Sequence, residues 1–291
     1  MGRITTDRSR LFKGVVLMLL ASLGFSSMSC CIKLAGNLPA LQKVFFRNLI
    51  SVGVVLLTLA KRHERISCKK ENAFLMFMRC ALGTVGIVGN YYAVDHMLLS
   101  NAAVLAKLSP FVTAIASWLL MSEKLRWPQL AAIAAAFFGS VLVTKPVSEA
   151  VGLLPVLSGL MAAFGAGTAY ACVRMLLKRG ENSNSIIFFF SAFSCLVCVP
   201  TMLVSYQPMT LYQTLCLLGA GCFASLGQFA MTNAYRFAAS REISAVEYSQ
   251  VIFAAIYGFV LFDQLPDVWS LLGYLVIFGA LILNSWYSSQ H

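Results

Sequence analysis

Charged residues are scarce in this sequence. Lys, Arg, Asp and Glu together make up 11% of its 291 residues, whereas an average soluble protein carries about 25%. Hydrophobic residues make up 59%, and the mean hydropathy is +0.79. So few charged side chains leave too little polar surface for a water-soluble globular domain, and that class is excluded. Lipid must therefore solvate most of the folded surface.

Motifs for hydrolysis, nucleotide binding and metal binding are also missing. There is no Walker A loop and no GxSxG elbow, and Ser67 stands where a second histidine would complete a metalloprotease motif with His63 and Glu64. The one CxxC pair, Cys195 and Cys198, falls inside an apolar run, so we interpret the nine cysteines as packing residues without disulfides or zinc. We therefore predict no enzyme, no cofactor and no metal site.

Acidic residues are the scarcer of the two charge types. Eleven Asp and Glu stand against 22 Lys and Arg, which gives a formal net charge of +11. The basic residues lie in short clusters between apolar runs, a pattern that orients membrane proteins, so we predict no nucleic-acid partner. Because a helix needs roughly 20 apolar residues to cross a bilayer, the runs predict an all-α membrane protein with ten transmembrane helices. They lie at 11–34, 40–60, 72–95, 98–121, 127–144, 152–177, 186–205, 212–235, 241–262 and 267–287.

The basic clusters also predict the orientation of these helices. With the N-terminus in the cytoplasm, fifteen Lys and Arg fall on the cytoplasmic side, and Lys33, Lys43 and Lys145 fall outside. By the positive-inside rule, both termini of a ten-span chain are then cytoplasmic, in the cell (inner) membrane. The first run has spanning length and is followed by no small-residue cleavage site, so we expect a retained span and not a signal peptide.

The chain contains an internal repeat. Offsets of 140 and 141 residues align several identical pairs: Ser100 with Ser240, Gly139 with Gly279, and Gly24 with Gly165. Residues 1–146 and 147–291 are therefore predicted to be two five-helix units within one membrane domain. Because an odd number of spans brings the second unit into the membrane from the opposite side, the repeats are inverted, as is typical of alternating-access transporters.

These features resemble the ten-helix drug/metabolite transporter superfamily, EamA type. The resemblance is carried by Phe46 and Arg47, by NAAVLAKLSPFVTAIASWLLMSEKL at 101–125, by its counterpart at 244–265, and by Gly139 and Gly279. It implies a ten-helix fold, a metabolite as substrate and a bias towards export. Two features depart from the pattern: Gln250 stands where proline is frequent, and Lys107 and Glu247 put charges into the two central spans.

Lys107 and Glu247 are the leading candidates for substrate binding. Lys107 is about nine residues into its span, near the midplane, where a charge needs a partner or a water-filled cavity. Glu247 is its repeat mate at an offset of 140 and shares a helix face with Ser244 and Gln250. Nearby Pro110 lacks an N–H and is predicted to kink the span as a hinge. The alternative is a buried ion pair that only staples the two halves together.

Other polar residues fall inside the predicted spans. Arg47 is expected to face the bundle, where substrate contact and bonding to helix-end carbonyls are equally compatible with its position. Asn90 lies in the third span and Gln228 in the eighth, each near glycines. The glycines predict either close helix packing or a cavity wall at these spans. Arg79 and Arg174 lie near span ends, so we expect both to extend to the cytoplasmic head groups in structural roles.

The leading hypothesis is a secondary active transporter that exports a small polar metabolite, an amino acid or related zwitterion, by alternating access. An alternative is a carrier for an anionic phosphorylated or nucleotide-linked metabolite, and an alternative from another class is a non-transporting receptor or embedded enzyme. The expected partners are the substrate and the lipid bilayer, with proton or exchange coupling. The fifth span carries Ala131, Ala135 and Gly139 on one face, which predicts packing against a neighbouring helix or against a second subunit in a homodimer.

Overall fold

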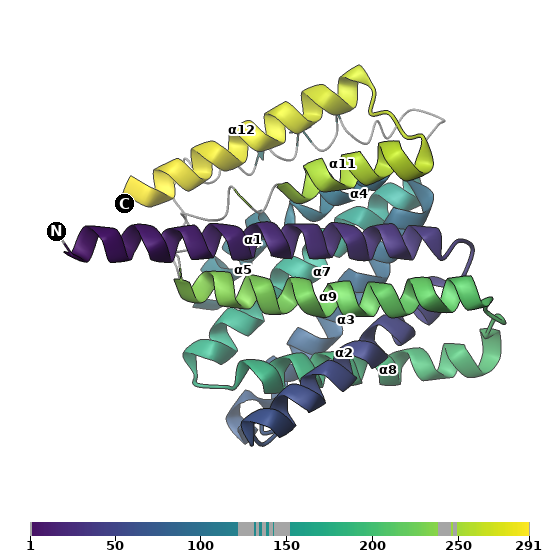
Figure 1. Ribbon diagram of the computed structural model, residues 1–291, viewed down its shortest axis with the longest axis horizontal. Coiled ribbons are helices and arrows are strands. Elements are labelled where there is room, and N and C mark those ends of the chain that lie inside the picture. Colours follow the sequence, from purple (N-terminus) through teal and green to yellow (C-terminus); the bar gives the residue numbers. More distant parts are fainter. Residues whose placement is uncertain are drawn as a thin grey trace.

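The computed structural model describes residues 2–121, 131, 134–135, 138–139, 142, 152–237, 246 and 249–290. Every regular element in this part of the chain is a helix, and the helices form one bundle (Figure 1). They are α1 (Gly2–Leu34), α2 (Ala40–Arg62), the short 3-10 helix η1 (Lys70–Asn72), α3 (Ala73–His96), α4 (Leu99–Ala106), α5 (Ser109–Met121), α7 (Leu153–Lys178), α8 (Ser183–Ser205), α9 (Leu211–Phe237), α11 (Ser249–Phe262) and α12 (Val268–Gln290).

The helices follow the predicted spans closely. Six stretches in the described chain are long and apolar enough to cross a membrane: Phe12–Leu34, Ala40–Arg62, Lys70–His96, Leu153–Lys178, Ser183–Ser205 and Leu211–Met231. Two shorter apolar helices, Ser249–Phe262 and Val268–Ala280, fall in the predicted ninth and tenth spans. The predicted fourth span is divided into α4 and α5. Most of the fifth, at 127–144, lies outside the described residues.

Two helix pairs at the centre of the bundle are related by the repeat. α1 packs along α9, as Figure 1 shows, and α3 packs along α7. A Cβ added to Gly24 would come within 3.0 Å of the Gly227 nitrogen, and a Cβ added to Gly165 within 2.7 Å of the Gly86 nitrogen. The 141-residue offset maps Gly24 onto Gly165. The same offset maps Gly86 onto Gly227. The close contact of Gly24 with Gly227 and that of Gly165 with Gly86 are therefore equivalent contacts in the two repeats, as inverted repeats require.

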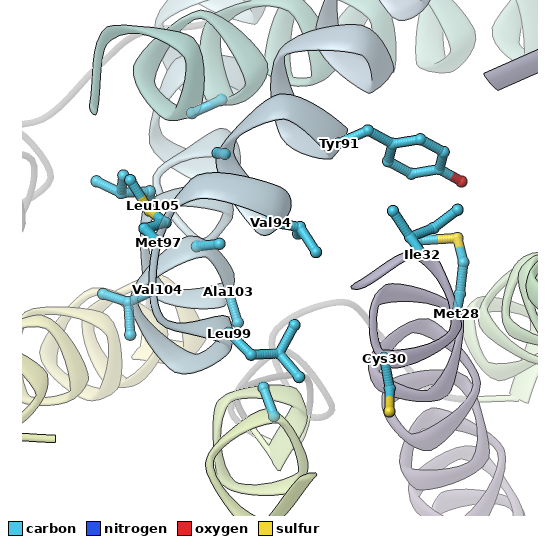
Figure 2. Close-up of a cluster of buried hydrophobic side chains, with 14 of the residues drawn as sticks. Met28, Cys30, Ile32, Tyr91, Val94, Met97, Leu99, Ala103, Val104 and Leu105 are labelled. Carbon is cyan, nitrogen blue, oxygen red and sulfur yellow. The ribbon is translucent and has the colours of Figure 1, made fainter. Parts of the chain in front are cut away.

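One end of the bundle, which we call the Asp95 end, is densely packed. Apolar side chains of α1, α3 and α4 meet there, and Figure 2 shows Met28 and Ile32 on the side of α1 that faces Tyr91. In α2, Lys43 Nζ donates to both carboxylate oxygens of Asp95, at 2.6 and 2.7 Å, and to the Ile32 carbonyl at 3.2 Å. This one ammonium group therefore joins α1, α2 and α3.

The opposite end, which we call the Glu181 end, is held by polar contacts between two connections. α7 ends before Gly180, whose φ of 79° suits glycine at a helix C-terminus. The next residue, Glu181, accepts hydrogen bonds through Oε1 from the Lys69 backbone N–H at 3.1 Å and from Asn72 Nδ2 at 2.6 Å. These bonds fix the α2–α3 connection against the α7–α8 connection.

The small-residue face of the fifth span has a partner within the same chain. A Cβ added to Gly139 would come within 2.6 Å of Ile277 Cγ1 and 3.0 Å of the Gly273 carbonyl oxygen, both in α12. The predicted packing of this face against a neighbouring helix is therefore confirmed at Gly139. A homodimer stays a prediction.

Candidate functional site

A cavity of about 160 Å³ lies inside the bundle, lined by helices from both repeats. Its wall includes apolar side chains such as Phe25, Met28 and Ile87. Seven larger polar or charged side chains also line it: Arg47 in α2, Arg79 and Asn90 in α3, Lys107 after α4, Tyr170 in α7, Gln228 in α9, and Gln250 in α11. An apolar wall with a few convergent polar groups is the usual character of a small-molecule site.

The tertiary structure brings together five of the seven residues predicted to bind substrate. Arg47, Asn90, Lys107, Gln228 and Gln250 line this one cavity although they come from five different parts of the chain. The remaining two predicted residues, Ser244 and Glu247, lie outside the described residues. The geometry therefore supports the predicted cavity, while the binding roles stay predictions.

Lys107 lies where the fourth span is interrupted. α4 ends at Ala106, and the Lys107 backbone N–H donates to the carbonyls of Val104 at 3.0 Å and Ala103 at 3.3 Å. α5 starts at Ser109, with Pro110 as its second residue, a position that suits proline because first-turn N–H groups have no intrahelical partner. The predicted interruption is confirmed, but it precedes Pro110. The hinge role of Pro110 stays a prediction.

The Lys107 side chain is buried, with 4% of the residue exposed. Because the helix ends at this residue, the break and the cation lie at the same point of the cavity wall. A buried ammonium at an interrupted helix can contact a polar solute without leaving the membrane interior.

Arg47 faces the interior of the bundle, as predicted. Only 3% of the residue is exposed, and its Nη1 donates to the Asn48 side-chain oxygen at 2.6 Å. Asn48 in turn donates to the Val44 carbonyl at 3.0 Å, so a backbone-anchored amide orients the guanidinium. The Arg47 Nε is buried and makes no hydrogen bond within the described chain.

The prediction that Arg79 extends to the head groups is wrong. Arg79 is 7% exposed and lines the cavity, and its guanidinium lies over the ring of Phe190, 4.1 Å from the ring centroid. A Cβ at Gly83 would collide with Arg79 Nη1 and reach 2.8 Å from Phe190, so this glycine provides the space for the stack. Sequence position gives depth along the helix, whereas the direction that Arg79 faces depends on helix packing.

The glycines of the third span have two roles. A Cβ at Gly86 or Gly89 would meet the backbone of α7, at 2.8 Å from the Ala166 nitrogen and 2.6 Å from the Ser158 oxygen respectively. Gly83 instead makes room for a cavity side chain. The two predictions, close packing and a cavity wall, are therefore both confirmed on one helix.

Gln250 belongs to an interface between the two halves of the chain. Its backbone carbonyl accepts a hydrogen bond from Ser26 Oγ of α1 at 2.8 Å, and Ser27 Oγ is 2.9 Å from the Tyr257 hydroxyl of α11. These bonds hold α11 against α1. The Gln250 side chain thereby lines the cavity at the junction of the repeats.

The charged lining of the cavity is basic. Arg47, Arg79 and Lys107 line it, and no Asp or Glu in the described part of the chain does so. The described chain also contains no group of three His, Cys, Asp or Glu side chains that could hold a metal ion. The described wall is therefore suited to binding a solute with anionic groups.

Sequence reasoning assigned Lys43 to the outside and did not single out Asp95. The structure buries Lys43 completely and pairs it with Asp95. Its assignment to the outer side of the membrane stays a prediction. The signal was present, since an acid in the last turn of a predicted span needs a cationic partner. Lys33, which also counted as an outside charge, donates to the backbone carbonyls of Val94 and Met97 at 3.0 and 2.6 Å.

Comparison with known proteins agrees with this architecture. The EamA-like transporter family matches the chain twice, at residues 12–145 and 153–286. The chain is 29% identical to the pseudopaline exporter CntI of Pseudomonas aeruginosa over 94% of this chain and 95% of that protein. It is 24% identical to a riboflavin transporter of Brucella anthropi, over 90% and 95% of the two chains.

More distant similarities extend over most of the chain. It is 24% identical to human solute carrier family 35 member G1, over 95% of this chain and 80% of that protein. A solved crystal structure superposes with a TM-score of 0.68 at 12% identity, covering 95% of this chain and 98% of the other, which shows a shared fold. The two family matches together cover most of the chain, and the relatives are transporters. The chain therefore belongs to the EamA-like transporter family and is a multi-pass membrane transporter of a small metabolite, not an enzyme.

Proposed function

We propose that the protein is a secondary active transporter that exports a small polar metabolite of the amino-acid type by alternating access. The observation that carries this proposal is the cavity between the repeats, with Lys107 from the first half and Gln228 and Gln250 from the second. A solute held by both halves is exposed to either side when the halves rock against each other. The similarity to the pseudopaline exporter supports export as the direction.

The size of the cavity favours a small solute. Sites for drug-sized ligands measure roughly 300–1,000 Å³, whereas this cavity measures about 160 Å³. A metabolite of amino-acid size suits that volume better than a nucleotide-linked metabolite, which is the alternative substrate considered from the sequence. We propose that the substrate carboxylate meets Lys107 and that Glu247, its repeat mate, takes the ammonium group. Proton or exchange coupling would drive transport.

Transport by the purified protein in proteoliposomes tests this proposal. We expect counterflow of one or more small amino-acid-type solutes from a panel, measured with and without a pH gradient. Lys107→Gln and Glu247→Gln should each weaken apparent affinity by about ten- to a hundredfold, because each removes a charge-assisted hydrogen bond. Lys61→Gln, at an exposed residue, is the control.

The same variants distinguish a substrate-binding site from an ion pair that only joins the two halves. If each single change lowers stability, the double change restores it and affinity does not change, the two residues only join the halves. Absence of counterflow for every solute, with or without the gradient, would contradict the transport proposal itself.

We also propose that both termini lie in the cytoplasm, in the inner membrane of the cell. α1 begins and α12 ends at the same end of the bundle (Figure 1), as an even number of spans requires. In this orientation the Asp95 end faces outwards. Leu265 is 71% exposed and lies in the connection between α11 and α12. In the same connection, the Gln264 side-chain oxygen accepts a hydrogen bond from the Leu99 backbone N–H, which places the connection at the Asp95 end.

An impermeant thiol reagent tests the orientation. In intact cells it should label Leu265→Cys and leave Cys68, near the Glu181 end, unlabelled. Burial and the Glu181 carboxylate raise the pKa of the Cys68 thiol. Because the thiolate is the reactive form, labelling of Cys68 in inside-out vesicles should increase as the pH rises, and Cys68→Ser provides the background. The reverse labelling pattern would contradict the orientation.

A further inference from the structure

We infer that Arg47 and Arg79 form a two-point anion site that selects metabolites with two carboxylate groups. This inference rests on the proposed function and deepens it, because it names the substrate class of the same cavity. The two residues come from neighbouring helices, α2 and α3, and both line the cavity. Both are more than nine-tenths buried, and in both the Nε is buried without a hydrogen-bond partner in the described chain.

Arg79 forms no ion pair within the described residues. Within the described residues one face of its guanidinium stacks on Phe190, and its buried Nε has no hydrogen-bond partner. Gly83 keeps this arrangement open, since a Cβ there would collide with Nη1. A guanidinium held flat against an aromatic ring with its Nε unpaired is a preformed fork for a carboxylate.

Arg47 is oriented in another way. Its Nη1 is bonded to the neutral Asn48 side chain, so the positive charge is positioned without being neutralised. The described chain contains ion pairs for Lys43 and Arg62, but none for Arg47 or Arg79. A buried cation without a counter-charge is costly in a membrane, and a bound carboxylate would relieve that cost at each arginine.

The placement of the two arginines favours two separated anionic groups over one. α2 and α3 run in opposite directions, and each arginine is six or seven residues from the start of its helix. At 1.5 Å rise per residue, Arg47 is about 10 Å from one end of a core about 30 Å thick, and Arg79 is about 10 Å from the other end. The two Cα atoms are thus at different depths, while both side chains line the same cavity. A dicarboxylate in this cavity therefore offers one carboxylate to each arginine.

Thermal unfolding of the purified full-length protein, titrated with succinate at constant ionic strength, tests this inference. Succinamate is the matched probe with one carboxylate, and succinamide is the neutral probe. We expect succinate to bind about ten- to a hundredfold more tightly than succinamate, since the second carboxylate gains its own charge-assisted bonds. Arg47→Gln and Arg79→Gln should each abolish the preference for the second carboxylate. Arg62→Gln removes an exposed charge and should leave the preference unchanged.

The stability of the empty protein distinguishes a binding role from a structural one. Because Arg79 has no counter-charge within the described residues, Arg79→Gln should raise the unfolding midpoint without ligand while it abolishes the preference for succinate. A lower midpoint with the preference retained would show that Arg79 only packs on Phe190, and would overturn the inference. If Arg79→Gln does not fold, Phe190→Leu keeps the charge, loses the platform and should reduce the preference.

This inference and the proposed function can fail separately. If proteoliposomes carry amino-acid-type solutes but the parent protein does not prefer succinate to succinamate, the two-point site is wrong and the transport proposal stands. If succinate binds through both arginines but no solute crosses the membrane, the site stands and the transport proposal is wrong.

Discussion

Gly165→Ala is expected to lower the free energy of unfolding by about 3 kcal/mol, at the upper end of the usual cost of overpacking a core. The added Cβ would lie 2.6 Å from the Leu82 carbonyl oxygen and 2.7 Å from the Gly86 nitrogen. Both are backbone atoms, so no side chain can rotate away and α3 must separate from α7. Thermal or denaturant unfolding of the purified protein measures the effect.

The chain contains its own controls for this change. Gly53 in α2 is exposed, and no atom lies within 4 Å of a Cβ added there, so Gly53→Ala should be neutral or stabilising by up to about 1 kcal/mol. Gly24→Ala should be intermediate, because its nearest backbone contacts in α9 are at 3.0 Å. Equal stability of Gly165→Ala and Gly53→Ala would contradict the close crossing.

Asp95→Asn is expected to destabilise the protein by about 3–5 kcal/mol, because it leaves the buried Lys43 ammonium without its counter-charge. Lys43 is completely buried and bonds both Asp95 oxygens, so the remaining amide cannot replace the carboxylate. The double variant Lys43→Met with Asp95→Leu should recover most of the loss, since neither charge is then buried. Unfolding of the two single variants and the double variant measures the coupling.

The exposed pair of Arg62 and Glu64 is the control for this cycle. Their closest charged atoms are 4.0 Å apart and the Arg62 side chain is 54% exposed. Water screens such a pair, so Arg62→Gln should change stability by less than about 1 kcal/mol. A small effect of Asp95→Asn, similar to that of Arg62→Gln, would show that the Lys43 ion pair does not hold the Asp95 end together.

The positions of Arg79 and Lys43 show where sequence reasoning reached its limit. Arg79 lies near the start of its helix, and on depth alone a long basic side chain there is expected to reach water. The pairing of Lys43 was not predicted. Depth follows from sequence because the rise per residue is constant. Which way a side chain faces depends on the neighbouring helices, here α8 with Phe190 and the end of α3 with Asp95.

The sequence by itself determined the membrane class, most of the helix bounds, the inverted repeat and the polar residues that needed a cavity. These follow from hydrophobic length, from periodic self-similarity and from the cost of burying charge, all of which are local properties of the chain. Only the tertiary structure decided that Gly86 pairs with Gly165, that Asp95 pairs with Lys43, and that Arg79 joins Arg47 in one cavity. Each of these depends on the rotation of one helix against another, and that rotation is set by close packing between residues far apart in the sequence.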